Sequence, residues 1–404
     1  MAKTLMAVDA GTGSVRAVLF SLEGEQLGCV QQEWTHREDP RYPGSMDFDW
    51  VHNWDLARGC IRGVIEQTGV DPHDIAAVST TCMREGIVLY DKDGQEIWAC
   101  ANVDARSDDE VAQLVHMNPE LEKQIYRESG QTYALGALPR LFWVKNKMPE
   151  VYEKTAMCTM FNDWLIYKMT GVFSSEPSNA CTTGIFDLKA RDWDDQIAAS
   201  IGLKTGIFPK ISECGTVVAQ VGAKGAAETG LAEGTPVVAG GGDAQLGCVG
   251  VGVVDANQAA IFGGSFWQYE YNTDEAKTDE HCRVRVNCHS VPGIWQYEAL
   301  AFKPGMVMRW YRDAFCQYEK ELSKTTGRDP YDLMNEKAKD IPAGCYGMMC
   351  AFSDVMNYIS WRHASPMFIN FDFDPDKFNR YTFYRAIMEN TAMVTYGHMQ
   401  LVRE

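Results

Sequence analysis

The sequence Asp-Ala-Gly-Thr-Gly-Ser-Val-Arg at residues 9–16 decides the fold. Apolar runs at 4–8 and 15–21 flank its glycines, which predicts two strands joined by a glycine turn. Because glycine has no Cβ, the backbone N–H groups of such a turn can point into a shared hollow. A hollow of this kind binds phosphate oxygens, and Thr12, Ser14 and Arg16 add hydroxyl donors and charge. Taken alone, the stretch predicts either a phosphate-binding hairpin or an ordinary tight hairpin.

The residues after the turn exclude two other phosphate-binding loops. A dinucleotide-binding turn and a P-loop both lead into a helix. Here the chain continues as Val-Arg-Ala-Val-Leu-Phe at 15–20, which is β-branched and apolar and too short for a helix before Gly24. The Gly-Lys-Ser/Thr of a P-loop is also missing from the turn.

Two carboxylates near glycine turns point to phosphoryl transfer. A carboxylate beside phosphates repels them unless a cation lies between, so Asp9 indicates Mg²⁺ held through water. A second glycine turn, at 240–243, ends in Asp243 after a predicted strand. Phosphoryl-transfer enzymes need a carboxylate that accepts the proton of the attacking hydroxyl, and Asp243 suits this role. Capping of the following helix is the alternative for Asp243.

A third glycine turn, Gly263-Gly264-Ser265, joins predicted strands at 258–262 and 266–271. It repeats the strand, glycine turn, strand plan of the N-terminal stretch. The three turns in this order are more specific than any one of them.

The bulk properties of the chain narrow its class. Its 404 residues suit two domains. A net charge of −18 argues against nucleic acid and anionic membranes as partners. The 13 cysteines are scattered singly, and the sequence shows neither a secretory signal nor an apolar run of membrane-spanning length, so a reducing cytoplasm is expected. The spacing of His281, Cys282, Cys288 and His289 matches no common zinc module.

Strand and helix signals mix along the whole chain, which places it in the α/β class. Strands are predicted at 4–8, 15–21, 26–34, 75–79, 86–90, 96–100, 234–239, 258–262 and 266–271. Helices are predicted at 49–69, 107–128, 139–170 and 382–404. A glycine-rich seam near 234–256 marks the start of a second domain.

The turns at 9–16, 241–243 and 263–265 resemble those of the FGGY carbohydrate kinases, a family that includes glycerol kinase and xylulokinase. The resemblance covers the whole chain and includes the stretches 164–171, 178–184 and 188–194. It implies MgATP-dependent phosphorylation of a hydroxyl on a small polyhydroxylated substrate.

The same resemblance implies the architecture. Two actin-like (ribonuclease H-like) ATPase domains with a central cleft are expected. Residues 1–248 would form the substrate and phosphate side, and 249–404 the nucleotide side. Family members carry a further C-terminal segment whose glycine-rich turn contacts adenine. The resemblance stops in the helix at 382–404, so the second domain is expected to be incomplete.

Carried over residue by residue, the resemblance implies a set of site residues. Asp243 matches the catalytic base, and Arg84-Glu85 match a pair that holds substrate hydroxyls, with a structural salt bridge as the alternative. The nucleotide and phosphate contacts would be Asp9, Gly11, Thr12, Gly13, Ser14, Arg16, Gly263, Gly264, Ser265 and Gly305. Asp9 and Asp243 would hold Mg²⁺ through water. Further candidates for substrate contact are Asp104, Gln131 and Asp163, for which helix capping or structural hydrogen bonds are equally plausible.

One branch of the family is more similar still. The stretches that resemble the autoinducer-2 kinases are 43–49, 83–90, 98–106, 312–316 and 368–377. This similarity implies phosphorylation of open-chain 4,5-dihydroxy-2,3-pentanedione at its terminal hydroxyl, with the phosphotransfer protein HPr as a candidate partner. Two alternatives stay open: a kinase for another sugar or polyol such as a pentulose, and a non-catalytic substrate-binding relative.

Overall fold

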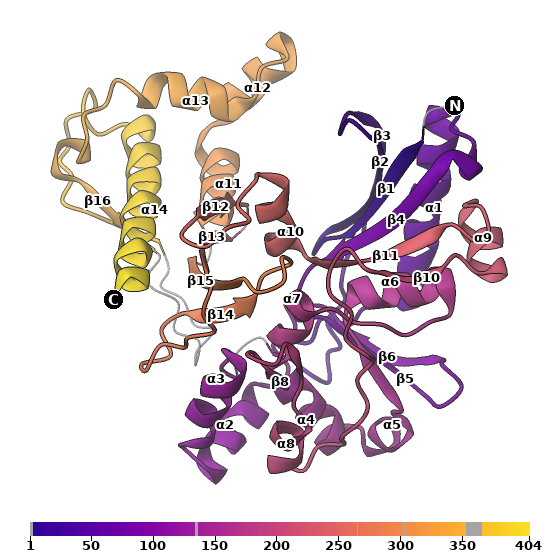
Figure 1. Cartoon of the computed structure of the whole chain (residues 1–404). Helices are drawn as coiled ribbons and strands as arrows, with labels where there is room; N and C mark the ends of the chain where they lie inside the picture. Colours follow the sequence, from indigo (N-terminus) through magenta and orange to yellow (C-terminus); the bar gives the residue numbers. More distant parts are fainter. Residues whose placement is uncertain (1–2, 134–135, 265, 302–303, 353–365) are drawn as a thin grey trace. The chain divides into compact units, whose positions relative to one another are not determined.

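The computed structural model describes residues 3–133, 136–264, 266–301, 304–352 and 366–404 (Figure 1). The chain forms two compact units. The first comprises 1–256, 273–278 and 286–296, and the second comprises 257–272, 279–285 and 297–404. Both contain strands and helices, which confirms the α/β class. The expected domain division after residue 248 stays a prediction.

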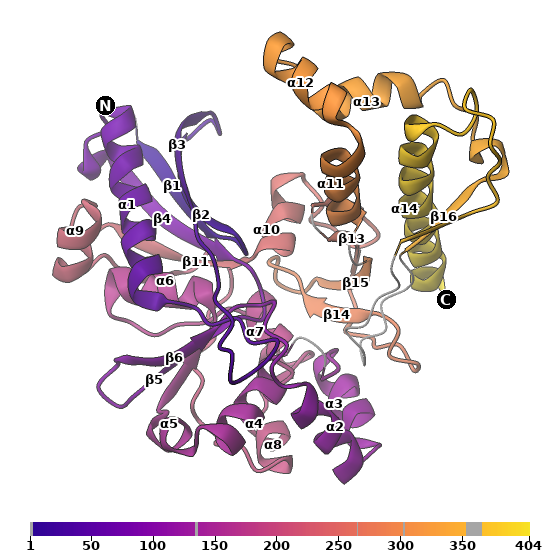
Figure 2. The ribbon, with the colours of Figure 1, turned by 180° about the vertical axis from the view of Figure 1, so that it is seen from behind.

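A six-stranded sheet organises the first unit, in the order β10-β11-β4-β1-β2-β3 (Figures 1 and 2). Its strands are β1 (Thr4–Ala10), β2 (Ser14–Ser21), β3 (Gln26–Glu33), β4 (Ile75–Cys82), β10 (Val217–Gln220) and β11 (Pro236–Gly242). The first three form the antiparallel meander that the sequence predicts. β4 runs parallel to β1, and β11 runs parallel to β4. Three strands therefore end at one edge of the sheet.

A layer of helices packs against this sheet. α1 (Trp50–Thr68) contacts β2 and β3, α6 (Phe161–Thr170) contacts β4 and β11, and α9 (Ala223–Thr229) contacts both helices. The Asp49 side chain caps α1 by accepting a hydrogen bond of 3.0 Å from the His52 amide. Gly69 ends the helix in the left-handed region, at φ 66°. The helix expected at 49–69 is thus confirmed.

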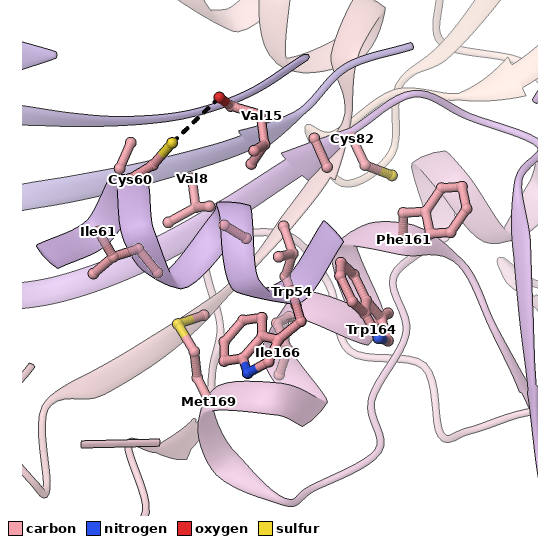
Figure 3. Packing of buried hydrophobic residues seen from close by; sticks show 14 of the residues in the cluster. Val8, Val15, Trp54, Cys60, Ile61, Cys82, Phe161, Trp164, Ile166 and Met169 are labelled. Carbon is pink, nitrogen blue, oxygen red and sulfur yellow. Dashed lines mark hydrogen bonds between the residues drawn. The ribbon is translucent and has the colours of Figure 1, made fainter. Parts of the chain in front are cut away.

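The core between these layers follows from the periodicity of each element. Met6, Val8 and Ala10 alternate along β1 and are buried, as expected for a strand with one covered face. Trp54 of α1 meets Trp164 of α6 edge to face, with 6.0 Å between ring centroids. Figure 3 shows Val8, Trp54 and Trp164 packed with other buried side chains between the strands and the helices. Full burial of each large apolar side chain contributes about 1.5–3 kcal/mol.

A second part of the first unit contains a three-stranded sheet in the order β6-β5-β7. β5 (Ile87–Tyr90) and β6 (Glu96–Cys100) form the predicted hairpin. The continuous helix expected at 139–170 is wrong, because β7 (Met157–Thr159) interrupts it and pairs with β5. The helices on either side are α4 (Ala137–Lys147), α5 (Pro149–Lys154) and α6.

The helical stretch expected at 107–128 divides at Pro119, whose ring prevents a continuous helix. It forms α2 (Asp108–Met117) and α3 (Leu121–Ser129). Short elements complete this unit: η1 (Pro72–Asp74), α7 (Pro177–Ala180), η2 (Cys181–Thr183), β8 (Phe186–Asp187), β9 (Asp192–Trp193), α8 (Asp195–Ser200) and α10 (Asp243–Gly250).

The chain after residue 256 forms a four-stranded sheet and a group of helices. The strands lie in the order β12 (Ala259–Gly263), β13 (Trp267–Thr273), β15 (Trp295–Ala301), β14 (Arg285–Cys288). The remaining elements are α11 (Pro304–Phe315), α12 (Gln317–Thr326), α13 (Pro330–Ala338), η3 (Cys345–Gly347), β16 (Met349–Ala351), β17 (Met367–Ile369) and α14 (Arg380–Arg403). β12 and β13 pair antiparallel, which confirms the predicted repeat of the strand, glycine turn, strand plan. Among the described helices, none is long and apolar enough to cross a membrane.

Candidate active site

The parallel strands of the first unit bring two predicted glycine turns to the same place. Asp9 of β1 pairs with Thr81 of β4, and Thr81 pairs with Gly241 of β11. Two strand spacings separate Asp9 from Gly241, which puts their Cα atoms about 10 Å apart. Asp243 comes two residues after Gly241. Ligands of α/β sheets bind beyond the carboxyl ends of parallel strands, so this edge is the candidate site.

The turn between β1 and β2 is held in shape from behind. The Gly11 amide donates to the Ser14 carbonyl at 2.9 Å and closes the turn. The Trp34 indole donates to the Gly11 carbonyl at 2.9 Å. The His36 ring donates to the Thr12 carbonyl at 2.7 Å. Two carbonyls of the turn are therefore bound by side chains of the protein.

Asp9 and Arg16 face each other at the base of this turn. Their strands place them in register, and the Arg16 guanidinium binds Asp9 Oδ2 through Nε at 2.9 Å and Nη2 at 2.8 Å. Burial raises the pKa of the Asp9 carboxyl, and Arg16 opposes that rise. Arg16 was expected to face phosphates, and in the structure Asp9 already binds it.

Asp243 begins helix α10, directly after β11. The structure makes Gly242 the N-cap residue of this helix, with no side-chain cap bond. One carboxylate oxygen accepts a hydrogen bond from the Ala244 amide at 2.9 Å. The same oxygen lies 3.6 Å from Arg84 Nε. The carboxylate is thus bound along one side only.

The environment of Asp243 suits a proton acceptor. Half of its side chain reaches solvent (50%), yet the protein atoms packed around the carboxyl raise its pKa to about 6. Arg84 lowers this pKa, while the neighbouring carboxylates of Glu85 and Asp9 raise it. A general base works best when its pKa lies near the working pH.

The glycines before Asp243 are required by packing. A Cβ on Gly240 would lie 1.5 Å from the Thr80 carbonyl oxygen of β4. A Cβ on Gly241 would lie 2.8 Å from Ser178 Oγ, and this hydroxyl also accepts a hydrogen bond from the Gly242 amide at 3.0 Å. Only glycine lets the end of β11 approach β4 and α7 so closely.

Arg84 and Glu85, the predicted substrate pair, lie between β4 and β5 and are both buried. Arg84 pairs with Asp243. Glu85 lies in the left-handed region at φ 66°, which is unusual for a residue with a side chain. Arg84, Glu85 and Asp243 are therefore brought together, with Glu85 in a strained conformation.

Asp104 is not brought to the open side of this group. It is buried, and its Oδ2 accepts a hydrogen bond from the Met46 amide at 2.6 Å. The Arg106 guanidinium binds both of its oxygens, at 3.0 and 2.8 Å. Arg106 in turn lies against the Trp98 and Trp143 rings. These contacts favour the structural alternative for Asp104.

Gln131 and Asp163 are also buried and bound within the protein. The Gln131 amide donates to the Val286 carbonyl at 3.0 Å. Asp163 Oδ2 accepts bonds from the Met160 amide at 3.1 Å and Ser175 Oγ at 2.8 Å. Burial raises the pKa of Asp163 well above its usual value. Direct substrate contact by either residue stays a prediction.

The predicted nucleotide residues of the second unit lie at the ends of two elements. Gly263 closes β12, and a Cβ there would lie 2.3 Å from the Trp267 ring. The Gly264 amide donates to the Phe266 carbonyl at 2.8 Å. Gly305 lies in the first turn of α11. The prediction for Ser265 falls outside the described residues.

The donor set at the sheet edge fits a water-bound divalent cation. In the part of the chain that the structure describes, no group of three or more His, Cys, Asp or Glu side chains could hold a metal ion. Mg²⁺ commonly binds through one or two carboxylates, with water and substrate phosphates as its other ligands. Asp9 and Asp243 fit this pattern, since each lies at the same edge of the sheet.

Sequence reasoning missed several residues that shape the site. Asn102 donates to Thr12 Oγ1 at 3.0 Å, and Ser178 holds the Gly242 amide. Both lie in stretches singled out only for their resemblance to a family. Trp34 and His36 gave no local signal, because their targets are carbonyls of a turn more than twenty residues away.

Comparison with known proteins agrees with this arrangement. Residues 4–250 match the model of the N-terminal domain of the FGGY family of carbohydrate kinases. The autoinducer-2 kinase of Klebsiella pneumoniae is 47% identical over 97% of this chain and 74% of its own length. That of Escherichia coli K12 is 47% identical over 99% of this chain and 76% of its own length.

Solved structures show the same fold. Xylulose kinase from Rhodospirillum rubrum aligns with a TM-score of 0.83 at 22% identity, over 99% of this chain and 79% of that one. Glycerol kinase from Plasmodium falciparum with ADP aligns with a TM-score of 0.80 at 17% identity, over 97% of this chain and 76% of that one. The actin-like fold expected from the sequence is therefore confirmed.

Proposed function

We propose that this chain, which belongs to the FGGY family of carbohydrate kinases, phosphorylates autoinducer-2. The substrate would be open-chain 4,5-dihydroxy-2,3-pentanedione, and ATP would donate its γ-phosphate to the terminal hydroxyl. The observation that supports the chemistry is the contact between Asp243 Oδ1 and Arg84 Nε at 3.6 Å. It lies at the edge of the six-stranded sheet where β1 ends and the 9–16 turn begins. The choice of substrate is supported by relatives of that name at 46–48% identity.

In this reaction Asp243 acts as the general base. It accepts the proton of the terminal hydroxyl as the oxygen attacks the γ-phosphorus of ATP. The new O–P bond forms while the bond between the γ-phosphorus and the β-phosphate oxygen breaks, and ADP leaves. Its pKa of about 6 keeps the carboxyl ionised at neutral pH but still basic enough to take a proton.

Arg84 and Glu85 would hold the substrate. A guanidinium donates and a carboxylate accepts, so together they can bind hydroxyl and carbonyl oxygens of a short chain. Asp104, Gln131 and Asp163 are further candidates for substrate contact, and in the structure the protein already binds their side chains.

The turn at 9–16 would bind phosphate oxygens of ATP. Its donors would be the Gly13 amide, the hydroxyls of Thr12 and Ser14, and the Arg16 guanidinium. Gly11, whose amide donates to the Ser14 carbonyl, would contribute by holding the turn in shape. In the second unit, nucleotide contacts are proposed at Gly263, Gly264, Ser265 and Gly305. Asp9 and Asp243 would hold Mg²⁺ through water, where it would offset the charge of the phosphates.

A cytoplasmic location belongs to the same proposal and is supported by the cysteines, none of which forms a disulfide within the described part of the chain. HPr is a candidate partner on the family resemblance alone, and a binding titration with purified HPr tests it.

The test is a substrate profile with purified protein, MgATP and a coupled assay of ADP release. Pentanedione should give a higher kcat/KM than xylulose, ribulose, erythritol or glycerol. A higher kcat/KM with a pentulose or polyol would refute pentanedione as the substrate but would still support kinase activity. Calorimetry of substrate and ATP binding tests the non-catalytic alternative. If the protein binds substrate but neither binds ATP nor releases ADP, the proposed kinase activity is wrong.

A further inference from the structure

Arg140 is a fully buried arginine on α4, exposed by only 1%. Its hydrogen bonds to described residues all go to backbone carbonyls. Nη1 donates to the Glu85 carbonyl, and Nη2 donates to the Asn102 carbonyl at 2.6 Å and the Asp104 carbonyl at 2.9 Å. The guanidinium therefore joins the loop before β5 to the loop after β6.

This arrangement is unusual for a buried charge. Among the described residues, no Asp or Glu forms an ion pair with Arg140. Removing a guanidinium from water is costly, and such groups are normally paired with a carboxylate. Carbonyl oxygens offset part of that cost, and only a planar fork of donors can reach three of them at once. A neutral apolar residue at this position would leave the three carbonyl oxygens without these donors, which is itself costly in a buried site.

The three carbonyls belong to segments that shape the site. Glu85 adopts a left-handed backbone conformation that residues with side chains avoid unless their surroundings enforce it. Asn102 donates from its side chain to Thr12 Oγ1 in the phosphate turn at 3.0 Å. Asp104 is fixed by Arg106 and by the Met46 amide.

We propose that Arg140 is a positioning residue that holds Glu85 in its strained conformation and couples the substrate pair to the phosphate turn through Asn102. It touches neither substrate nor nucleotide. One arm of the guanidinium fixes where the Glu85 carboxylate points, and the other fixes the backbone from which Asn102 reaches Thr12. The identity of the substrate rests on the proposed function, but the effect on the backbone does not.

The first test is Arg140→Lys, which keeps the positive charge but replaces the fork with one ammonium group. We expect KM for the polyhydroxylated substrate to rise at least tenfold. Backbone amides in a peptide spanning 83–90 should exchange with deuterium at least tenfold faster in the free protein. Arg191→Lys is the control, because Arg191 also donates to two carbonyls, of His289 and Ile294. Arg191 binds the Glu213 carboxylate as well, and none of its three partners is a predicted site residue.

The control variant should lose thermal stability to a similar degree without changing KM or exchange at 83–90. If the two variants have the same KM and the same exchange at 83–90, Arg140 has only a structural role and the proposal is wrong. The exchange comparison needs no substrate. A wild-type protein inactive on pentanedione therefore refutes the proposed substrate and leaves the test of Arg140 intact.

Asn102→Ala tests the proposed link from Arg140 Nη2 through Asn102 to the phosphate turn. This test remains available if the Arg140→Lys variant does not fold. This variant removes the bond to Thr12 and leaves the Arg140 contacts to backbone in place, because those use the Asn102 carbonyl. We expect KM for ATP to rise about fivefold to tenfold, with KM for the second substrate within twofold of wild type. An unchanged KM for ATP would overturn the coupling to the phosphate turn.

Discussion

Replacing Asp243 with Asn tests the proposed chemistry most directly. The change removes the negative charge and the basic lone pairs but keeps the shape of the side chain and an oxygen that can accept the Ala244 amide bond. Arg84, whose Nε lies 3.6 Å from Asp243, loses the negative charge of that carboxylate. The backbone of the 240–243 turn is held by Ser178 and by the contact with β4, so it should not move.

The expected fall in kcat follows from the proposed role of Asp243 as the general base. With a pKa of about 6, roughly nine tenths of Asp243 is ionised at pH 7 and available as a base. Loss of a general base lowers the rate by about 10²–10⁴-fold, or about 2.7–5.4 kcal/mol in the barrier. We expect this fall in kcat, and substrate affinity within about threefold of wild type.

The assay measures ADP release at saturating substrate and MgATP, with substrate binding measured separately by calorimetry. Asp194→Asn is the matched control. Asp194 caps α8 by accepting a bond of 2.8 Å from the Gln196 amide, a role that Asn fills equally well. The control should keep wild-type kcat. An Asp243→Asn variant with kcat within threefold of wild type would refute Asp243 as the base.

Three further predictions concern the pH dependence of the reaction and the stability of the first unit. Because protonated Asp243 cannot accept a proton, kcat/KM should fall about tenfold per pH unit below about pH 6, and a pH–rate profile that stays flat to pH 5 would contradict this. Gly240→Ala should lower the free energy of unfolding by about 2–3 kcal/mol in urea titrations, since the new Cβ meets the Thr80 carbonyl, whereas Gly59→Ala in α1, with open space around it, should raise it by about 0.5–1 kcal/mol. Asp49→Ala removes the cap of α1 and should cost about 1 kcal/mol in the same titration; no loss would mean that other contacts fix the start of the helix.

The sequence predicted those parts of the fold whose signals are local. The hairpin around 9–16, the β12–β13 hairpin and helix α1 each have their strand or helix periodicity and their turn residues within about twenty positions. β7 was missed because three residues inside a helical pattern carry no visible signal, and its pairing with β5 lies almost seventy residues away. A short strand of this kind forms only when it pairs with a neighbouring strand, so tertiary contacts determine its secondary structure.

The candidate site shows the same division. Asp243 and Arg84 were predicted from motifs, and the structure brings them together. The partners of Asp104 and Gln131 could not be predicted, because they come from segments distant in sequence. Arg140 gave no signal either, since an arginine in an amphipathic helix ordinarily faces solvent. Its function depends on carbonyl oxygens, which every residue possesses and no sequence pattern marks.

The charges at the sheet edge argue for a cation more strongly than the sequence did. Asp9, Glu85 and Asp243 supply three carboxylates, whereas Arg16 and Arg84 supply two guanidinium groups. The structure pairs Arg16 with Asp9 and Arg84 with Asp243, so both positive charges are already bound. Phosphates entering the 9–16 turn would meet the carboxylates of Asp9 and Asp243 at the same edge of the sheet. Like charges at such distances raise one another's pKa, as Asp9 and Glu85 do for Asp243. In the proposed reaction, a divalent ion between the phosphates and the two aspartates would reduce this repulsion and leave Arg16 able to bind phosphate.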